Sequence, residues 1–166
     1  MNFMTDEQRD LLSRRLKAAA EEQPEIEVLR TRLLVIGGVE LVAPPNRDPD
    51  VPALVEQGEL ITGSVKLESM DSSRCHENLS ELWTDRKTGL TAIGTGYALS
   101  KDGLWRQHSW GMKDHEIIET TKERTTYFGI LLEGSTADAF AQANRGGSRR
   151  TSMAASPRSP FSTGKR

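Results

Sequence analysis

The sequence contains a single cysteine, Cys75, among its 166 residues. One cysteine cannot form a disulfide within the chain, so the cysteine content gives no sign of an oxidising compartment. The first fifteen residues, MNFMTDEQRDLLSRR, include acidic residues and lack the apolar stretch of roughly 7–15 residues that a secretory signal peptide needs. The sequence therefore predicts a cytoplasmic protein.

Apolar residues are also scarce, at 36% of the chain, against roughly 45–50% in ordinary globular proteins when Gly is counted. The longest apolar run, residues 33–36, is far shorter than the roughly 20 residues that cross a membrane. We therefore expect no membrane span. The length suits one domain with appendages, and the low apolar content indicates that part of the chain does not fold.

A surplus of positive charge is missing as well, because the formal net charge is −2. Domains dedicated to nucleic acids usually carry a strongly basic face, so this class is disfavoured. Basic residues gather only in residues 135–166, where six Lys or Arg accompany one acid, Asp138. This Ser-, Gly- and Ala-rich stretch predicts a disordered basic tail, with a short helix near residues 136–143 left open. We interpret the tail as a solvated extension, and only there could nucleic acid or an anionic membrane bind.

An amphipathic helix is predicted within residues 1–24. Thr5 and Gln8 have the spacing of a capping box, and Pro24 ends the segment. The apolar residues recur at helical spacing and form a narrow stripe: Leu11, Leu12, Leu16 and Ala19. Such a stripe is typical of a helix that packs on the core of its own chain or on a partner.

Residues 25–134 are predicted to form an α+β core domain. Branched residues and the Gly37-Gly38 pair favour two short strands within residues 26–42, and four of the seven prolines make residues 43–52 a loop. One helix is predicted over residues 74–83. Further strands are predicted over residues 60–70, 91–99, 104–112, 116–121 and 125–132, and Gly103 suits the left-handed position of a three-residue hairpin loop.

Cys75 is predicted to open the helix over residues 74–83. The dipole and free N–H groups of a helix start lower the pKa of a thiol there, and the same N–H groups can bind an oxyanion. The N–H of Cys75, together with Gln107 or Asn78, is the candidate oxyanion site. The alternative is that Cys75 is a small core residue, as lone cysteines commonly are.

His108 and Glu119 are predicted to be partners across a hairpin. A turn at Lys113-Asp114, or a four-residue loop around it, places the two residues directly opposite each other, so that they share a face of the sheet. The carboxylate would then fix the tautomer of the imidazole and leave its other nitrogen as a general base. A three-residue turn would send the two side chains to opposite faces. Asp114 and Glu116 are the alternative acids.

The remaining histidines and tryptophans near these elements are expected to have mainly structural roles. Cys75 and the three histidines lack the spacing of metal ligands, so we expect no metal and no cofactor. His76 is expected to point away from Cys75 as an exposed or capping residue. Trp105 and Trp110 are expected to pack the sheet, with Trp110 also a candidate to line a substrate groove.

The order of these elements resembles a known family. His108-Ser109-Trp110 is similar to an H-A-W motif, residues 118–121 to a strand ending in D-x-T, and Gly96-Tyr97 to the G-Y/W found before the histidine. These motifs belong to the transglutaminase-like group of papain-like cysteine enzymes, which includes peptide N-glycanases and, more distantly, arylamine N-acetyltransferases. The sequence departs from the family at Glu119, where Asp is usual, and at Met112, where an acid often stands.

The resemblance implies a helix carrying Cys75 packed on an antiparallel sheet, as in a papain or transglutaminase core. It also implies a cysteine-dependent amide hydrolase or acyltransferase, such as a protease, deamidase or transglutaminase. Cys75 would be the nucleophile, His108 the base and Glu119 the orienting acid, acting on amide, thioester or glutamine carbonyls of a protein or small molecule. The alternative hypothesis is a non-catalytic interaction module that docks through its amphipathic helix or its tail.

Overall fold

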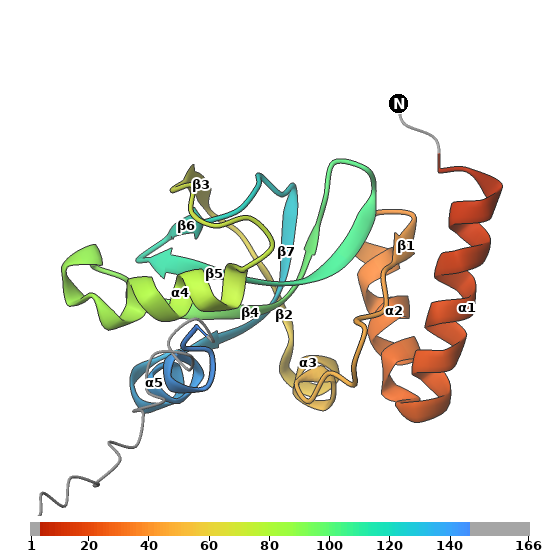
Figure 1. Ribbon diagram of the computed structural model, residues 1–166, viewed down its shortest axis with the longest axis horizontal. Helices are drawn as coiled ribbons and strands as arrows, with labels where there is room; N and C mark the ends of the chain where they lie inside the picture. The colour runs from red at the N-terminus through yellow and green to blue at the C-terminus, as the bar shows by residue number, and fades with distance from the viewer. Residues whose placement is uncertain (1–3, 147–166) are drawn as a thin grey trace, which may run out of the picture.

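The computed structural model describes residues 4–146, which form an α+β fold (Figure 1). Its helices are α1 (Asp6–Glu22), α2 (Glu25–Ile36), α3 (Val51–Gln57), α4 (Cys75–Thr84), the 3-10 helix η1 (Arg86–Thr88) and α5 (Gly134–Ala143). Its strands are β1 (Glu40–Leu41), β2 (Glu59–Ile61), β3 (Ser64–Leu67), β4 (Ala92–Leu99), β5 (Leu104–Lys113), β6 (Glu116–Glu119) and β7 (Thr126–Leu132). No helix within residues 4–146 is both long and apolar enough to cross a membrane.

The strands form one mostly antiparallel sheet in the order β2-β7-β4-β5-β6-β3. The short strand β1 pairs in parallel with Leu104 and Trp105 at the start of β5, and β6 pairs only with the last three residues of β5. Within the described residues, the middle of β5 therefore has no strand partner on the side away from β4. His108 lies in this unpaired stretch, where a helix end can approach it.

Helices cover the sheet at two places (Figure 1). Helices α4 and α5 pack against each other and over β4 and β5, around a cluster formed by Leu79, Trp83, Ile93, Ala137 and Ala141. Helices α1, α2 and α3 surround a second cluster near the start of β5, which includes Leu16, Leu29, Leu33, Leu54 and Trp105. The first of these arrangements fixes the start of α4 beside β5.

Two predicted local structures are confirmed. Thr5 caps α1, and Thr5 and Gln8 make both hydrogen bonds of the capping box. The β4–β5 hairpin closes through residues 101–103, with Gly103 at a φ of +83°. Glycine adopts this left-handed conformation without steric cost, which explains why it ends the loop.

The prediction of two strands in residues 26–42 is wrong for most of that stretch, which forms α2 and only the two-residue β1. Ile26, Leu29 and Leu33 recur at helical spacing and are all buried against the sheet. This burial outweighs the modest preference of branched residues for strands. The helix ends at the Gly37-Gly38 pair that had suggested a turn.

The folded core extends beyond the predicted boundary at residue 134. Residues 134–143 form α5, so the prediction that disorder begins at residue 135 is wrong there, and the short helix left open near residues 136–143 is present. Ala137 and Ala141 are buried against α4, and small side chains allow this close packing. The rest of the predicted tail, from residue 147 onward, lies outside the described residues.

Candidate active site

Cys75 is the first residue of α4 and lines a cavity of about 820 Å³. His108, Gln107, Ser73 and Thr121 line the same cavity, so the predicted nucleophile and base share one space. The first helical hydrogen bond of α4 runs from the N–H of Asn78 to the carbonyl of Arg74. The N–H groups of the residues before Asn78 have no such partner within a helix, and such groups are suited to receive negative charge.

His108 and Glu119 form a buried hydrogen-bonded pair. The His108 Nε2 atom lies 2.8 Å from Glu119 Oε2, and the side chains are only 2% and 0% exposed. Because a carboxylate is an acceptor, Nε2 carries the proton of this bond and Nδ1 is the ring nitrogen left for the cavity. The predicted partnership of the two residues is present in the structure.

The predicted register of this pair needs a correction. The turn lies at Asp114-His115 rather than Lys113-Asp114, and β5 pairs with β6 through Lys113 and Glu116. Asp114 has a φ of +54°, a left-handed conformation that Asp tolerates better than most residues. The register is therefore shifted by two residues, and His108 and Glu119 are diagonal neighbours. A shift by two keeps both side chains on the same face, so the contact survives.

Glu119 is held by four hydrogen bonds. Besides His108, its carboxylate accepts from the Tyr127 hydroxyl at 3.0 Å and from the Thr121 N–H and hydroxyl at 3.0 and 3.1 Å. Burial alone would raise the pKa of Glu119, but the hydrogen bond and charge of His108 and the hydrogen bonds of Thr121 and Tyr127 lower it overall. The carboxylate is therefore ionised and fixed, which orients the His108 ring.

The pKa of Cys75 is lowered to about 5. Burial opposes ionisation of the thiol, but hydrogen bonding and charge from His108 and from His76 outweigh it. The same coupling raises the pKa of His108, although burial works against its protonation. At neutral pH the sulfur is thus a thiolate, the reactive form of a cysteine nucleophile, and the raised pKa of His108 favours a protonated ring beside it.

His76 does not point away from Cys75, so that prediction is wrong. Its Nδ1 atom lies 3.3 Å from the Cys75 sulfur and 2.9 Å from the Ser109 hydroxyl, and its ring packs on Phe140 at 5.5 Å. His108 and Ser109 are consecutive on a strand and face opposite sides of it. Helix α4 packs on the face of β5 that carries Ser109, which brings His76 to Ser109. The sequence pattern did not indicate this packing.

The remaining predicted site residues lie in different places. Gln107 is exposed and lines the cavity of Cys75. Asn78 is buried, and its amide donates to the Asp71 carbonyl at 2.8 Å and to the Thr120 hydroxyl at 3.3 Å, so it braces the loop before α4. Trp110 is fully buried and packs edge-on against Tyr127, and it is not among the residues that line the cavity.

Trp110 supports the histidine from the core. Its ring stacks at 6.4 Å from the His108 ring, on the same face of β5. Gly94 makes room for it, because a Cβ atom there would lie 2.1 Å from the indole. Gly129 does the same at 2.8 Å. Gly94 of β4 and Gly129 of β7 thus leave room for the Trp110 indole beside His108, and the indole limits rotation of the His108 ring.

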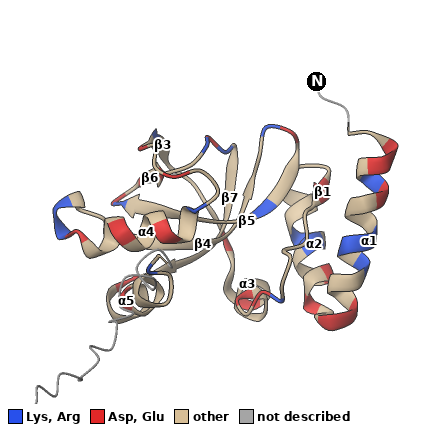
Figure 2. Cartoon of the chain, in the orientation of Figure 1, with Lys and Arg blue, Asp and Glu red and all other residues tan. Residues whose placement is uncertain are grey.

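Charged residues from two loops surround the cavity mouth. The β4–β5 loop contributes Lys101 and Asp102, and Figure 2 shows both signs of charge in that loop. Four of the charged lining residues form two ion pairs, Arg106 with Asp102 at 2.8 Å and Lys101 with Glu123 at 3.1 Å. Lys122 and Arg124 also line the cavity and form no ion pair within the described residues. The cavity lining therefore carries a surplus of positive charge.

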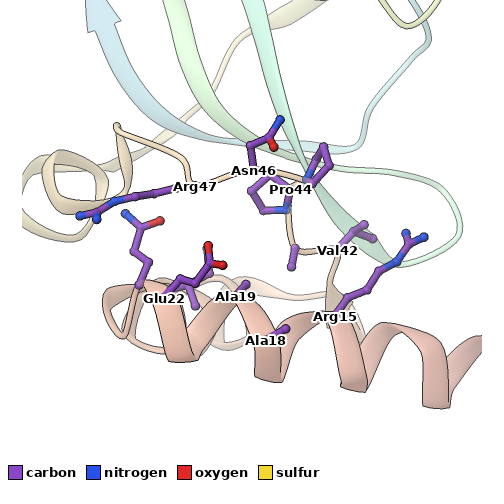
Figure 3. Close-up of a pocket in the computed structure, with 12 residues that line it drawn as sticks. Arg15, Ala18, Ala19, Glu22, Val42, Pro44, Asn46 and Arg47 are labelled. Carbon is purple, nitrogen blue, oxygen red and sulfur yellow. The ribbon is translucent and has the colours of Figure 1, made fainter.

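A second cavity, of about 510 Å³, lies between α1 and residues 42–47 (Figure 3). Its lining is formed by small and apolar side chains with a few charged ones, including Arg15, Ala18, Ala19, Glu22, Val42, Pro44 and Arg47. Neither cysteine nor histidine lines it. The cavity of Cys75 is consequently the better candidate for chemistry.

Within residues 4–146, no group of three or more His, Cys, Asp or Glu side chains is arranged to hold a metal ion. No protein-family model, curated protein or solved structure matches this chain. The site must therefore be interpreted from its own geometry.

Proposed function

We propose that this protein is a cysteine-dependent amide hydrolase or acyltransferase with Cys75, His108 and Glu119 as its catalytic triad. One observation carries the proposal: a sulfur with a pKa of about 5 shares a cavity with a histidine that a buried carboxylate fixes. A merely structural cysteine needs neither the imidazole nor the carboxylate behind it.

In the first half of the reaction, the Cys75 thiolate attacks the carbonyl carbon of the substrate and forms a C–S bond. The carbonyl oxygen takes the negative charge and is bound by free N–H groups at the start of α4, with Gln107 at hand in the cavity. Protonated His108 then gives its Nδ1 proton to the leaving group as the bond between the carbonyl carbon and that group breaks. The product of this half is a thioester on Cys75.

In the second half, water or an amine attacks the thioester. Neutral His108 takes a proton from the attacking group, the C–S bond breaks, and Cys75 returns as a thiolate beside an imidazolium. Glu119 stays ionised throughout and stabilises the imidazolium through its bond to Nε2. Water as the attacking group gives hydrolysis, and an amine gives acyl transfer.

The proposal follows the order of elements that the resemblance to transglutaminase-like enzymes implies. The cysteine starts a helix, the histidine lies on a central strand, and the acid lies on the next antiparallel strand. We propose amide, thioester or glutamine side-chain carbonyls as the substrate class. The unpaired cations Lys122 and Arg124 favour substrates that carry negative charge near the reacting carbonyl.

The proposal is tested with 4-nitrophenyl acetate, a simple acyl donor. We expect the intact protein to gain the mass of one acetyl group at Cys75 and then to release it, because the site forms and resolves a thioester. Cys75→Ala should gain none. His115→Ala, which removes an exposed histidine outside the cavity, should behave like the wild type. A folded wild-type protein that is never acetylated would leave the non-catalytic interaction module as the account of this fold.

A further inference from the structure

The histidine next to the nucleophile in sequence also contacts it in space. We propose that His76 is a second catalytic partner of Cys75, which holds the charge on the sulfur, while His108 carries the proton to and from the reacting groups. The inference rests on the proposed function and assigns different tasks to the two histidines. A triad alone requires only His108.

The position of the His76 ring is well determined by its contacts. Nδ1 lies 3.3 Å from the sulfur and 2.9 Å from the Ser109 hydroxyl, so one nitrogen serves two partners. Phe140 of α5 packs against the ring at 5.5 Å. Ser109 is fully buried. These contacts come from α4, β5 and α5, so three elements of the fold determine where the ring lies.

A single proton on Nδ1 can point at only one of its two partners at a time. While Cys75 is a thiolate, its full negative charge makes the sulfur the stronger acceptor. Once the sulfur becomes part of a thioester, that charge is gone, and the proton can turn to the Ser109 hydroxyl. Ser109 thus prevents a partly buried N–H donor from losing its partner halfway through the reaction, which would be costly.

His108 is less suited to holding the charge throughout. Its Nδ1 proton leaves with the departing group, so after that step a neutral ring faces the sulfur. His76 keeps its proton through the cycle and again stabilises the thiolate as it is released. The charged or titratable groups that act on His76 include Cys75 beside it, His108 from β5, and Asp48 and Asp50 from the loop before α3. The two aspartates favour a protonated His76, and protonated His108 opposes it.

The experiment measures the rate at which iodoacetamide alkylates Cys75 as a function of pH, in the full-length protein. For His76→Ala we expect alkylation at pH 6 to slow by about tenfold, because loss of a neighbouring positive charge moves the thiol titration upward. His76→Asn places an amide donor near the position of Nδ1 but carries no positive charge, so it should recover only part of that rate. His115→Ala serves as the matched control and should leave the rate unchanged.

Two results separate this inference from the proposed function. If alkylation at pH 6 is unchanged in both His76 variants while 4-nitrophenyl acetate is still turned over, the role of His76 is wrong and the triad stands. If the His76 variants slow alkylation as expected but no acetyl group is ever transferred, the role of His76 stands and the proposed function is wrong. If His76→Ala fails to fold, His76→Asn decides. A rate below that of the wild type at pH 6 and at lower pH, but equal to it above pH 8, supports the inference, and a rate equal at all pH values overturns it.

Discussion

His108→Ala should lower the turnover of 4-nitrophenyl acetate by about 10²–10⁴-fold, the usual contribution of a general base. Nitrophenolate leaves without a proton, so formation of the acetyl-cysteine should survive. Removal of the acetyl group needs a base to activate water, and no other imidazole has a free nitrogen supported by Glu119. We therefore expect the variant to accumulate as the acetylated protein, detected by intact mass after rapid quenching.

The same variant should keep part of its reactivity toward iodoacetamide near neutral pH, because the loss of His108 raises the pKa of Cys75 while His76 still contacts the sulfur. His115→Ala is the control for the loss of a histidine as such. Turnover that is unaffected by His108→Ala would exclude His108 as the base. An equal loss in His115→Ala would show that the effect is not specific to the site.

Glu119→Ala should be the most destabilising single change at the site. It leaves His108 without its partner and removes the acceptor for the Tyr127 hydroxyl and for both donors of Thr121. Breaking a buried charged pair by removing one partner costs about 3–5 kcal/mol. In a chain of this size the melting temperature should fall by roughly 10 °C, measured by thermal unfolding.

The matched control is Glu116→Ala, at the other end of the same strand, which should change stability by no more than about 0.5 kcal/mol. A similar loss of stability in both variants would mean that any alanine substitution in β6 destabilises the fold. Equal stability of Glu119→Ala and the wild type would show that the buried pair contributes nothing.

The stability difference between wild type and Glu119→Ala should depend on pH. The pKa of Glu119 is lowered from 4.5, so its contribution is present above pH 4.5 and disappears as the pH falls through the lowered value. The pKa of His108 is raised from 6.5, so its contribution is present below pH 6.5 and disappears as the pH rises through the raised value. The difference should therefore be largest between about pH 4.5 and 6.5.

The pairing of His108 with Glu119 could be predicted from the sequence because it requires only a turn with an even number of residues, wherever that turn lies. The predicted turn was wrong by one residue, yet the resulting register shift of two left both side chains on one face. The hairpin ending at Gly103 and the helix that begins at Cys75 follow from similarly local signals. These local signals predict the pair of His108 with Glu119 and the helix start at Cys75, whereas the packing of α4 on β5 brings Cys75 and His108 to one cavity.

The errors concern features set by packing between distant elements. Residues 26–36 form a helix because Ile26, Leu29 and Leu33, which recur at helical spacing, are buried together, and this burial outweighs the strand preference of the branched residues. His76 contacts Ser109 because α4 packs on β5. The amide of Asn78 donates to Thr120, the residue that follows β6, because this residue lies beside the start of α4. The contacts of His76 and Asn78 join elements far apart in the sequence, so no local pattern predicts them.

The central claim is that Cys75 is a thiolate nucleophile at neutral pH. It is tested most directly by titrating the thiolate absorbance near 240 nm in the wild-type protein, with Cys75→Ser as the blank. We predict a midpoint at about pH 5, so that the thiolate signal is already nearly complete at pH 6.5. A midpoint between about pH 8 and 9, that of an ordinary thiol, would contradict the claim and the enzyme proposal with it.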